Sequence, residues 1–171
     1  MKTLIAYFSH VGENMANGKI TILEKGNTEK VAEKIHSLIE SDLYKIEPKE
    51  AYSFSYRDCN ARAKREDEND ERPEILDTIG LNMNNYDVIY LGFPIWYRTF
   101  PRIIATFLSK YDFAGKTIIP FCTNDEEYFG IPLLELQSRA KDAILKEGLV
   151  IRGVLVDNAN KQIEEFVNKN K

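Results

Sequence analysis

Short apolar runs alternate along the chain with segments in which apolar residues recur at helical spacing. A nearly continuous apolar run of this kind is typical of a strand that is buried on both faces of a sheet. Such strands are predicted at residues 3–8, 43–46, 87–92, 116–121 and 149–156.

The segments between these strands have the pattern of helices. After the first strand, apolar residues at positions 31, 32, 35, 38 and 39 share one helical face. Pro101 is suited to the first turn of a second helix, and Gly148 to the position just after a third. The predicted helices are the one around 31–39, a charged surface helix within 52–72, one opened by Pro101, one over 132–146, and a short one from about 160.

Alternation of strands and helices predicts an α/β fold with a parallel sheet and helices on both faces. We expect one domain over residues 1–171, because no low-complexity tract divides the chain. In open sheets of this kind, ligands lie outside the carboxyl ends of the strands. The residues that follow each strand are therefore the candidates for a functional site.

Composition limits both the classes of binding partner and the cellular compartment that we expect. The formal net charge of -4 disfavours binding to nucleic acid or to an anionic membrane surface. Cys59 and Cys122 are far apart and lack the spacing of metal ligands, which favours a reducing compartment. The first apolar run is too short for a signal peptide, and no run approaches the ~20 residues of a membrane span. We expect a soluble, cytoplasmic protein.

The first strand ends at Ser9-His10, and an insertion from Val11 to Lys25 separates it from Gly26-Asn27-Thr28 at the start of a helix. The first amides of a helix lack partners within the helix and carry partial positive charge, so they can bind a phosphate group. The alternative is an ordinary helix cap made by Asn27 or Thr28.

The third and fourth strands end in residues suited to a flat, polar ligand. Trp96 and Tyr97 follow the third strand and could stack on a conjugated ring, although they could also pack between loop and core. After the fourth strand, Thr123 and Asn124 offer hydrogen bonds to the edge of such a ring. The three strand ends together predict one site with a phosphate cradle, an aromatic wall and a polar rim.

These motifs resemble the flavodoxin-like family, in particular its bacterial flavodoxin-type FMN-binding proteins. The resemblance lies in Tyr7-Phe8-Ser9, in Gly12-Glu13-Asn14 ahead of a delayed Gly26-Asn27-Thr28, in the segment 92–96, and in the segment 112–123. It implies a doubly wound five-stranded parallel sheet in the order 2-1-3-4-5. It also implies FMN bound noncovalently between the first and third strands, the arrangement for which flavodoxin is a standard example.

The resemblance assigns roles residue by residue. The phosphate would be held by Ser9, His10, Asn27 and Thr28, with Asn14 from the insertion; the ring would be walled by Pro94, Ile95, Trp96 and Tyr97; and its other side would be lined by Cys122, Thr123 and Asn124. The chain departs from the family after Asn124, where fewer glycines follow. We expect Tyr128 to supply stacking there in place of backbone contacts.

The predicted function is electron transfer through the bound flavin, with a redox partner protein or a small electron acceptor as partner. Asp125, Glu126 and Glu127 would raise the negative potential beside the ring and attract basic partners. We expect a monomer or homodimer. The alternatives are an NAD(P)H-dependent FMN-containing oxidoreductase or quinone reductase, a binding protein that has lost the cofactor, and a phosphoacceptor signalling module. The last is disfavoured because the first and third strands do not end in the acidic residues that it needs.

Overall fold

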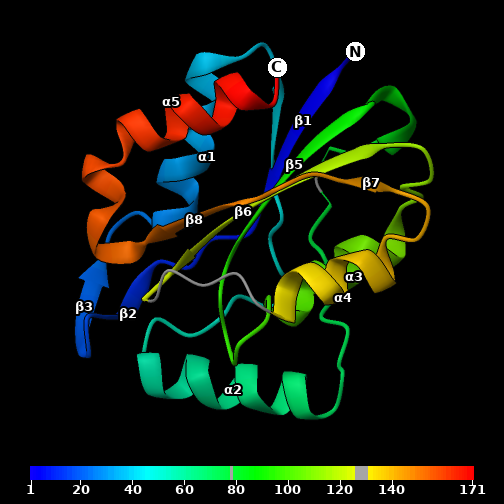
Figure 1. Ribbon diagram of the computed structural model, residues 1–171. Coiled ribbons are helices and arrows are strands. Elements are labelled where there is room, and N and C mark those ends of the chain that lie inside the picture. Colours follow the sequence, from blue (N-terminus) through cyan, green and yellow to red (C-terminus); the bar gives the residue numbers. More distant parts are fainter. Residues whose placement is uncertain (78, 126–130) are drawn as a thin grey trace.

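The structure is a computed structural model, and it describes residues 1–77, 79–125 and 131–171. Its centre is a parallel sheet in the spatial order β4-β1-β5-β6, followed by β7 and β8, which both pair with β6 (Figure 1). The strands are β1 (Thr3–Tyr7), β4 (Asp42–Lys45), β5 (Val88–Pro94), β6 (Thr117–Asn124), β7 (Ile144–Leu145) and β8 (Leu149–Arg152). The predicted doubly wound parallel sheet is confirmed.

The fifth position of the sheet differs in detail from the prediction, because two short strands share it. β7 pairs with the start of β6, at Thr117↔Ile144, and β8 pairs with its end, at Phe121↔Leu149. The predicted helix over 132–146 is accordingly shorter, and α4 spans Ile131–Arg139. The Ile144 amide donates to the Lys116 carbonyl at 2.8 Å, so sheet pairing replaces the last helical turns.

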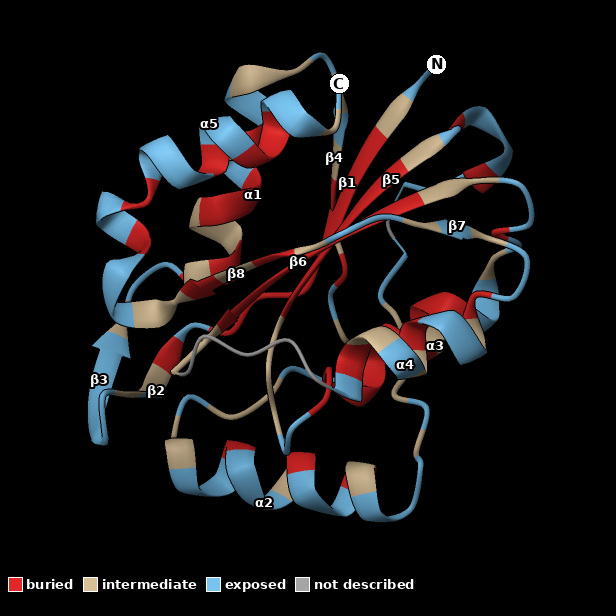
Figure 2. Cartoon of the chain, viewed as in Figure 1, coloured by how far each residue is buried: buried red, intermediate tan, exposed pale blue. Residues whose placement is uncertain are grey.

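Helices cover both faces of the sheet (Figure 1). They are α1 (Asn27–Leu38) and α5 (Asn160–Lys169) on one face, and α3 (Arg102–Lys110) and α4 on the other. Each pair encloses its own apolar cluster: Ile5, Val31 and Ile163 belong to the first, and Phe93 and Phe107 to the second. Figure 2 shows the buried residues concentrated along the strands and on the inner helix surfaces. Each face of the sheet thus forms one side of a separate hydrophobic core.

A further helix, α2 (Tyr56–Glu68), lies apart from these layers, beyond the carboxyl ends of the strands (Figure 1). It falls within the stretch predicted as a surface helix, and most of its residues are exposed. Its far end is tied to the second helical layer, where Arg102 pairs with Asp70 at 3.0 Å and with Glu135 at 2.9 Å. α2 is therefore anchored at a fixed place over the sheet edge.

The insertion after the first strand forms a hairpin of β2 (Gly12–Ala16) and β3 (Lys19–Leu23). Asn17 and Gly18 connect the strands with φ angles of 52° and 74°. Two consecutive positive φ angles are those of the tight turn whose twist matches a hairpin, and Asn-Gly is its preferred sequence. The hairpin is a separate two-stranded sheet, not an extension of the main one.

Two 3₁₀ turns complete the described chain: η1 (Met83–Asn85) before β5, and η2 (Gly153–Asn158) after β8. The predicted last strand, 149–156, therefore ends at Arg152 and its remainder is η2. No helix among the described residues has the length and apolarity needed to cross a membrane.

Candidate functional site

A cavity of about 330 Å³ opens at the carboxyl edge of the sheet, between the hairpin, α2 and the loop after β5. Small-ligand sites occupy cavities of roughly 300–1,000 Å³ and favour this edge of an α/β sheet. Eleven of the twelve predicted site residues line it: Ser9, His10, Asn14, Asn27, Thr28, Pro94, Ile95, Trp96, Tyr97, Thr123 and Asn124. The structure thus brings together residues from four separate segments of the chain.

Cys122 is the exception. Successive side chains of a strand point to opposite faces, and at the end of β6 Thr123 lines the cavity while Cys122 packs in the core. The Cys122 side chain is 1% exposed, so the expectation that it lines the site is not met. Burial raises the pKa of its thiol to about 12 and keeps the sulfur protonated.

The phosphate cradle predicted from Ser9, Asn27 and Thr28 has a defined geometry. Ser9 Oγ accepts a hydrogen bond from the Glu29 amide at 3.1 Å and so caps α1 from outside the helix. Asn27 and Thr28 lie inside the first turn and do not cap it, contrary to the alternative interpretation of this segment. Within the described part of the chain, their two amides are left without an acceptor.

Gly26 is what allows Ser9 and the helix start to meet. A Cβ atom at this position would lie 2.1 Å from Ser9 Oγ and 2.7 Å from the His10 carbonyl oxygen. Real atoms do not approach so closely, and only glycine fits between the end of β1 and the start of α1. The requirement is steric, because Gly26 itself has an ordinary φ of -65°.

A hydroxyl pair links this cradle to the polar rim. Thr28 Oγ1 and Thr123 Oγ1 are 2.8 Å apart, and both residues are buried. One hydroxyl donates to the other, which leaves the second proton free to serve another acceptor. The ends of α1 and β6 are therefore coupled at the site.

Trp96 forms the centre of the aromatic wall. Its indole meets the rings of Phe8, Tyr52 and His10 edge to face, at centroid distances of 5.4, 5.1 and 5.8 Å. Trp96 packs against the core, as one interpretation expected, and it also lines the cavity; its stacking on a ligand ring stays a prediction.

Tyr97 is held in an unusual backbone conformation. Tyr97 and Arg98 have φ angles of 49° and 68°, between the paired backbone groups of Trp96 and Thr99. Side chains seldom adopt such angles, and residues that do so gather at functional sites. The Tyr97 hydroxyl donates to Asn60 Oδ1 at 2.8 Å, so this strained turn is fastened to α2.

Apart from Asn14, the sequence-based site omits the walls supplied by the hairpin and by α2. These added lining residues are Glu13, Met15 and Leu23 of the hairpin and Tyr56, Cys59, Asn60 and Ala63 of α2, together with Asp125 and Gly153. Asn17-Gly18 between alternating apolar residues is the signal that would have predicted the hairpin. α2 carries no comparable signal, because its buried face consists only of Cys59, Ala63 and Glu66.

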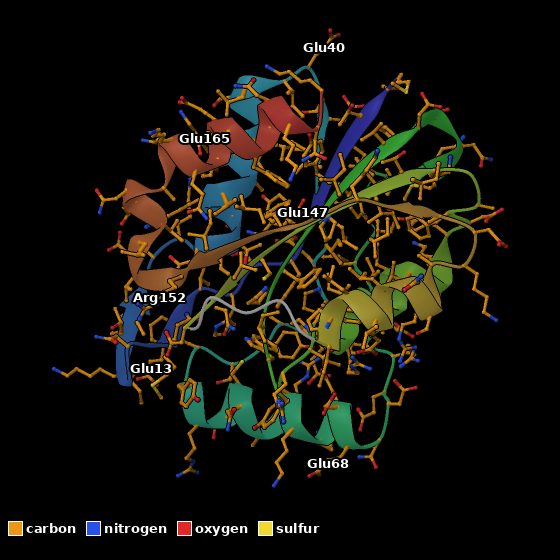
Figure 3. All side chains as sticks on the ribbon, viewed as in Figure 1. Glu13, Glu40, Glu68, Glu147, Arg152 and Glu165 are labelled. Carbon is orange, nitrogen blue, oxygen red and sulfur yellow. The ribbon has the colours of Figure 1, made fainter. Side chains whose placement is uncertain are left out.

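The hairpin is joined to both of its neighbours by acidic side chains. Glu13 Oε2 accepts from the Tyr56 amide at 2.8 Å, and so the hairpin caps α2, whose own Ser55 makes no capping bond. Asp125 Oδ1 accepts from the Asn17 amide at 3.1 Å, and the Asp125 carbonyl accepts from Arg152. Figure 3 shows Glu13 and Arg152 on the same side of the molecule, where these elements meet. Glu126, Glu127 and Tyr128, to which roles were also assigned, lie outside the described residues.

Comparison with known proteins places the chain in a family. A family model described as flavodoxin matches residues 2–170. The chain belongs to the flavodoxin family. No curated protein gives a significant match to it.

Several solved structures have the same fold as this flavodoxin family member. A candidate flavoprotein from Bacteroides uniformis is 29% identical, with 98% of this chain and 97% of that chain covered and a TM-score of 0.76. A flavoprotein from Lactobacillus acidophilus, crystallised in complex with FMN, is 25% identical over 92% and 97%, with a TM-score of 0.66. Oxidised flavodoxin 2 from Bacillus cereus, 21% identical over 99% of both chains with a TM-score of 0.52, shares the fold.

Proposed function

We propose that this protein binds FMN noncovalently in the cavity at the carboxyl edge of the sheet and transfers electrons through it. The observation that carries the proposal is the convergence of a helix-terminal phosphate cradle and an aromatic wall on one cavity. The cavity lies where β1 and β5 adjoin, which is the switch point of the strand order. Membership of the flavodoxin family and the FMN complex of the Lactobacillus relative support the same cofactor.

The residues present fit a phosphate ester of a flavin. The amides of Asn27 and Thr28 stand at the positive end of the α1 dipole, where a phosphate gains hydrogen bonds and favourable electrostatic energy together. Gly26 lets Ser9 lie against the start of α1, because a side chain at this position would collide with Ser9 Oγ. Trp96 and Tyr97 offer ring surface to the conjugated part of the ligand.

FMN would supply the redox chemistry, and the protein would bind and orient it. In this arrangement Ser9 fixes the first turn of α1, and the Thr28–Thr123 pair holds the cradle against the rim. α2 and the hairpin restrict the access of water to the cavity from two sides. The Cys59 thiol, also in the lining, is not a nucleophile at neutral pH, because burial raises its pKa to about 12.

Electron transfer is the activity that this arrangement supports, with a redox partner protein or a small acceptor approaching the cavity mouth. Met15 and Tyr97 both line the cavity and are each 39% exposed. Apolar surface of this kind beside a cofactor site suits brief contact with a partner, because it loses water easily on contact.

The test begins with the purified protein and its absorption spectrum, followed by titration with FMN. A yellow protein, or a colourless one that binds added FMN in stoichiometric amount, supports the cofactor. Chemical reduction followed by rapid reoxidation with a one-electron acceptor supports the carrier role. Bleaching of the flavin by NADH or NADPH without another enzyme would instead assign the oxidoreductase activity, and failure to take up FMN would overturn the proposal.

A further inference from the structure

Two turns of this chain have the same backbone conformation but very different sequences. The hairpin turn, Asn17-Gly18, has φ angles of 52° and 74°, and the turn after β5, Tyr97-Arg98, has φ angles of 49° and 68°. In both, the flanking residues pair as they do around a two-residue connection. Asn-Gly is the sequence that this turn prefers, whereas tyrosine and arginine adopt positive φ only under strain. Contacts outside the turn must therefore hold Tyr97 and Arg98 in place.

One of these contacts comes from α4. Thr99, directly after the turn, has its Oγ1 atom 2.5 Å from Glu135 Oε2. The backbone of Thr99 also pairs with that of Trp96, at 2.8 and 3.1 Å, and so closes the turn. Thr99 is buried, and water has little access to take the place of the bond. The residue that closes the turn is therefore fixed to α4 through Glu135.

Glu135 is ionised in this position. Its Oε1 atom lies 2.9 Å from Arg102 Nη1 and accepts from Arg139 Nε at 2.8 Å. Burial acts to raise the pKa of the Glu135 carboxyl, but the bonds from Arg102 and Thr99 outweigh it and the pKa lies below its usual range. A carboxylate can only accept, so the Thr99 hydroxyl donates. Hydrogen bonds to a charged group are the stronger kind, which suits this one to holding a strained turn.

Further contacts leave the turn little room to relax. The Tyr97 hydroxyl donates to Asn60 Oδ1 at 2.8 Å, on α2. Trp96, Tyr97 and Arg102 help to line a void of only about 10 Å³. A void of that size holds roughly one water molecule and no side chain. The turn is thus packed between α2 and the start of α3, and its bond to Glu135 ties it to α4 as well.

We propose that Glu135 is a positioning residue for the flavin: through its bond to Thr99 it keeps the Tyr97-Arg98 turn in the strained conformation that places the Tyr97 ring at the cavity. This rests on the proposed function. Tyr97 lines the cavity, whereas Thr99 and Glu135 do not, so these two act through Tyr97 and not by contact with the ligand. The strain arises because the turn carries an aromatic ring where its backbone favours Asn-Gly.

The experiment measures the dissociation constants of FMN and riboflavin for the wild type, Thr99→Val, Thr99→Ser and Thr106→Val. Thr99→Val keeps the shape of the side chain and removes the hydroxyl, and Thr99→Ser keeps the hydroxyl. Thr106→Val is the matched control, because Thr106 donates within its own helix, to the Arg102 carbonyl at 3.3 Å. Thr99→Val is expected to weaken both flavins by the same factor, about five- to tenfold, because a ring contact is lost and not a phosphate contact. Thr99→Ser and Thr106→Val should bind both flavins as the wild type does.

Double variants test whether the effect passes through the turn. In a Tyr97→Ala background, Thr99→Val should weaken neither flavin further, because the ring that it positions is absent. Glu135→Ala should weaken both flavins, and adding Thr99→Val to it should have no further effect. The visible circular dichroism of the bound flavin reports what lies against its ring, which a loss of stability alone does not change. Thr99→Val should shift this spectrum toward that of Tyr97→Ala, and Thr106→Val should not.

Three results would overturn the inference while leaving FMN binding intact. They are unchanged flavin affinity in Thr99→Val, a loss for FMN much larger than that for riboflavin, and a full further loss when Thr99→Val is added to Tyr97→Ala. If Glu135→Ala does not fold, the Thr99 variants still decide, because they leave Glu135 its two arginine partners. A wild type that binds neither flavin would overturn the proposed function instead.

Discussion

The hydroxyl oxygens of Thr28 and Thr123 lie 2.8 Å apart in a buried position, where they join the first turn of α1 to the last residues of β6. The two residues are far apart in sequence, and no other hydrogen bond among the described residues links these two elements through side chains. Each hydroxyl is the hydrogen-bond partner of the other. Removing either one therefore disturbs both the first turn of α1 and the end of β6, on the two sides of the cavity.

Thr123→Val is expected to lower the free energy of unfolding by about 1–3 kcal/mol, because it leaves the Thr28 hydroxyl buried without its partner. Urea denaturation of the flavin-free protein measures the change. The double variant Thr28→Val/Thr123→Val should recover part of the loss, since it leaves no unpaired hydroxyl. Additive losses in the double variant would show that the pair is not coupled.

Gly26→Ala is expected to weaken FMN binding by at least about tenfold, because the new methyl group must displace Ser9 and the His10 carbonyl from the cradle. Titration with FMN checks this. Gly80→Ala is the control: Gly80 has φ of 62° and no atom within 4 Å of the added group. It should lower stability by about 1 kcal/mol and leave FMN affinity unchanged.

Most of the candidate site follows from the sequence because the carboxyl ends of parallel strands must meet at one edge. Correct strand boundaries alone are enough to predict that four residues share this edge: Ser9, Thr28, Trp96 and Thr123. Cys122, which the resemblance placed beside the ring, packs in the core, because its side chain points to the opposite face of β6 from that of Thr123.

The remaining parts of the fold depend on tertiary contacts that local pattern does not show. Ile144 and Leu145 continue the apolar spacing of α4, yet pairing with β6 makes them a strand. α2 has the composition of a solvated helix, and its place over the cavity is set by bonds made by Glu13, Tyr97 and Arg102. Such long-range bonds override local propensity.

Glu13→Ala is expected to lower the free energy of unfolding by about 0.5–2 kcal/mol, because α2 loses the carboxylate that caps its first amide. It should also speed the release of FMN, since the side-chain bond from the hairpin to the first turn of α2 beside the cavity is then lost. Denaturation and stopped-flow fluorescence measure the two effects. Glu13→Gln keeps an acceptor oxygen and should lose less, whereas Glu24→Ala, at the exposed end of the hairpin, should resemble the wild type.

Stability should fall in alkaline solution because of the two buried cysteines. Burial raises the pKa of Cys59 and of Cys122 from 9.0 to about 12. The unfolded thiols ionise first, so the protein is stabilised fully below pH 9, and that contribution is lost progressively between pH 9 and pH 12, at up to about 1.4 kcal/mol per pH unit for each thiol.

Denaturation between pH 8.5 and pH 9.5 measures the loss. The difference between the wild type and Cys122→Ala isolates the contribution of one thiol, because the buried tyrosines, whose pKa values are also raised, titrate alike in both proteins. Cys122→Ala should lose stability less steeply with rising pH than the wild type, by the contribution of the one thiol removed. Equal slopes in the two proteins would contradict the assignment. At pH 8, neither native thiol should react with a disulfide reagent until the protein is unfolded.

The hairpin has a further consequence for engineering. The two halves of the phosphate cradle are held together through space by Ser9 and Glu29, so the chain between them is free to vary in length. Asn17 and Gly18 lie at an exposed turn in the middle of that chain. A second protein domain inserted there would leave the sheet intact while pulling directly on one wall of the flavin cavity. Ligand binding to such a guest domain would then be read as a change in flavin emission, which makes this turn a natural point of attachment for a genetically encoded sensor.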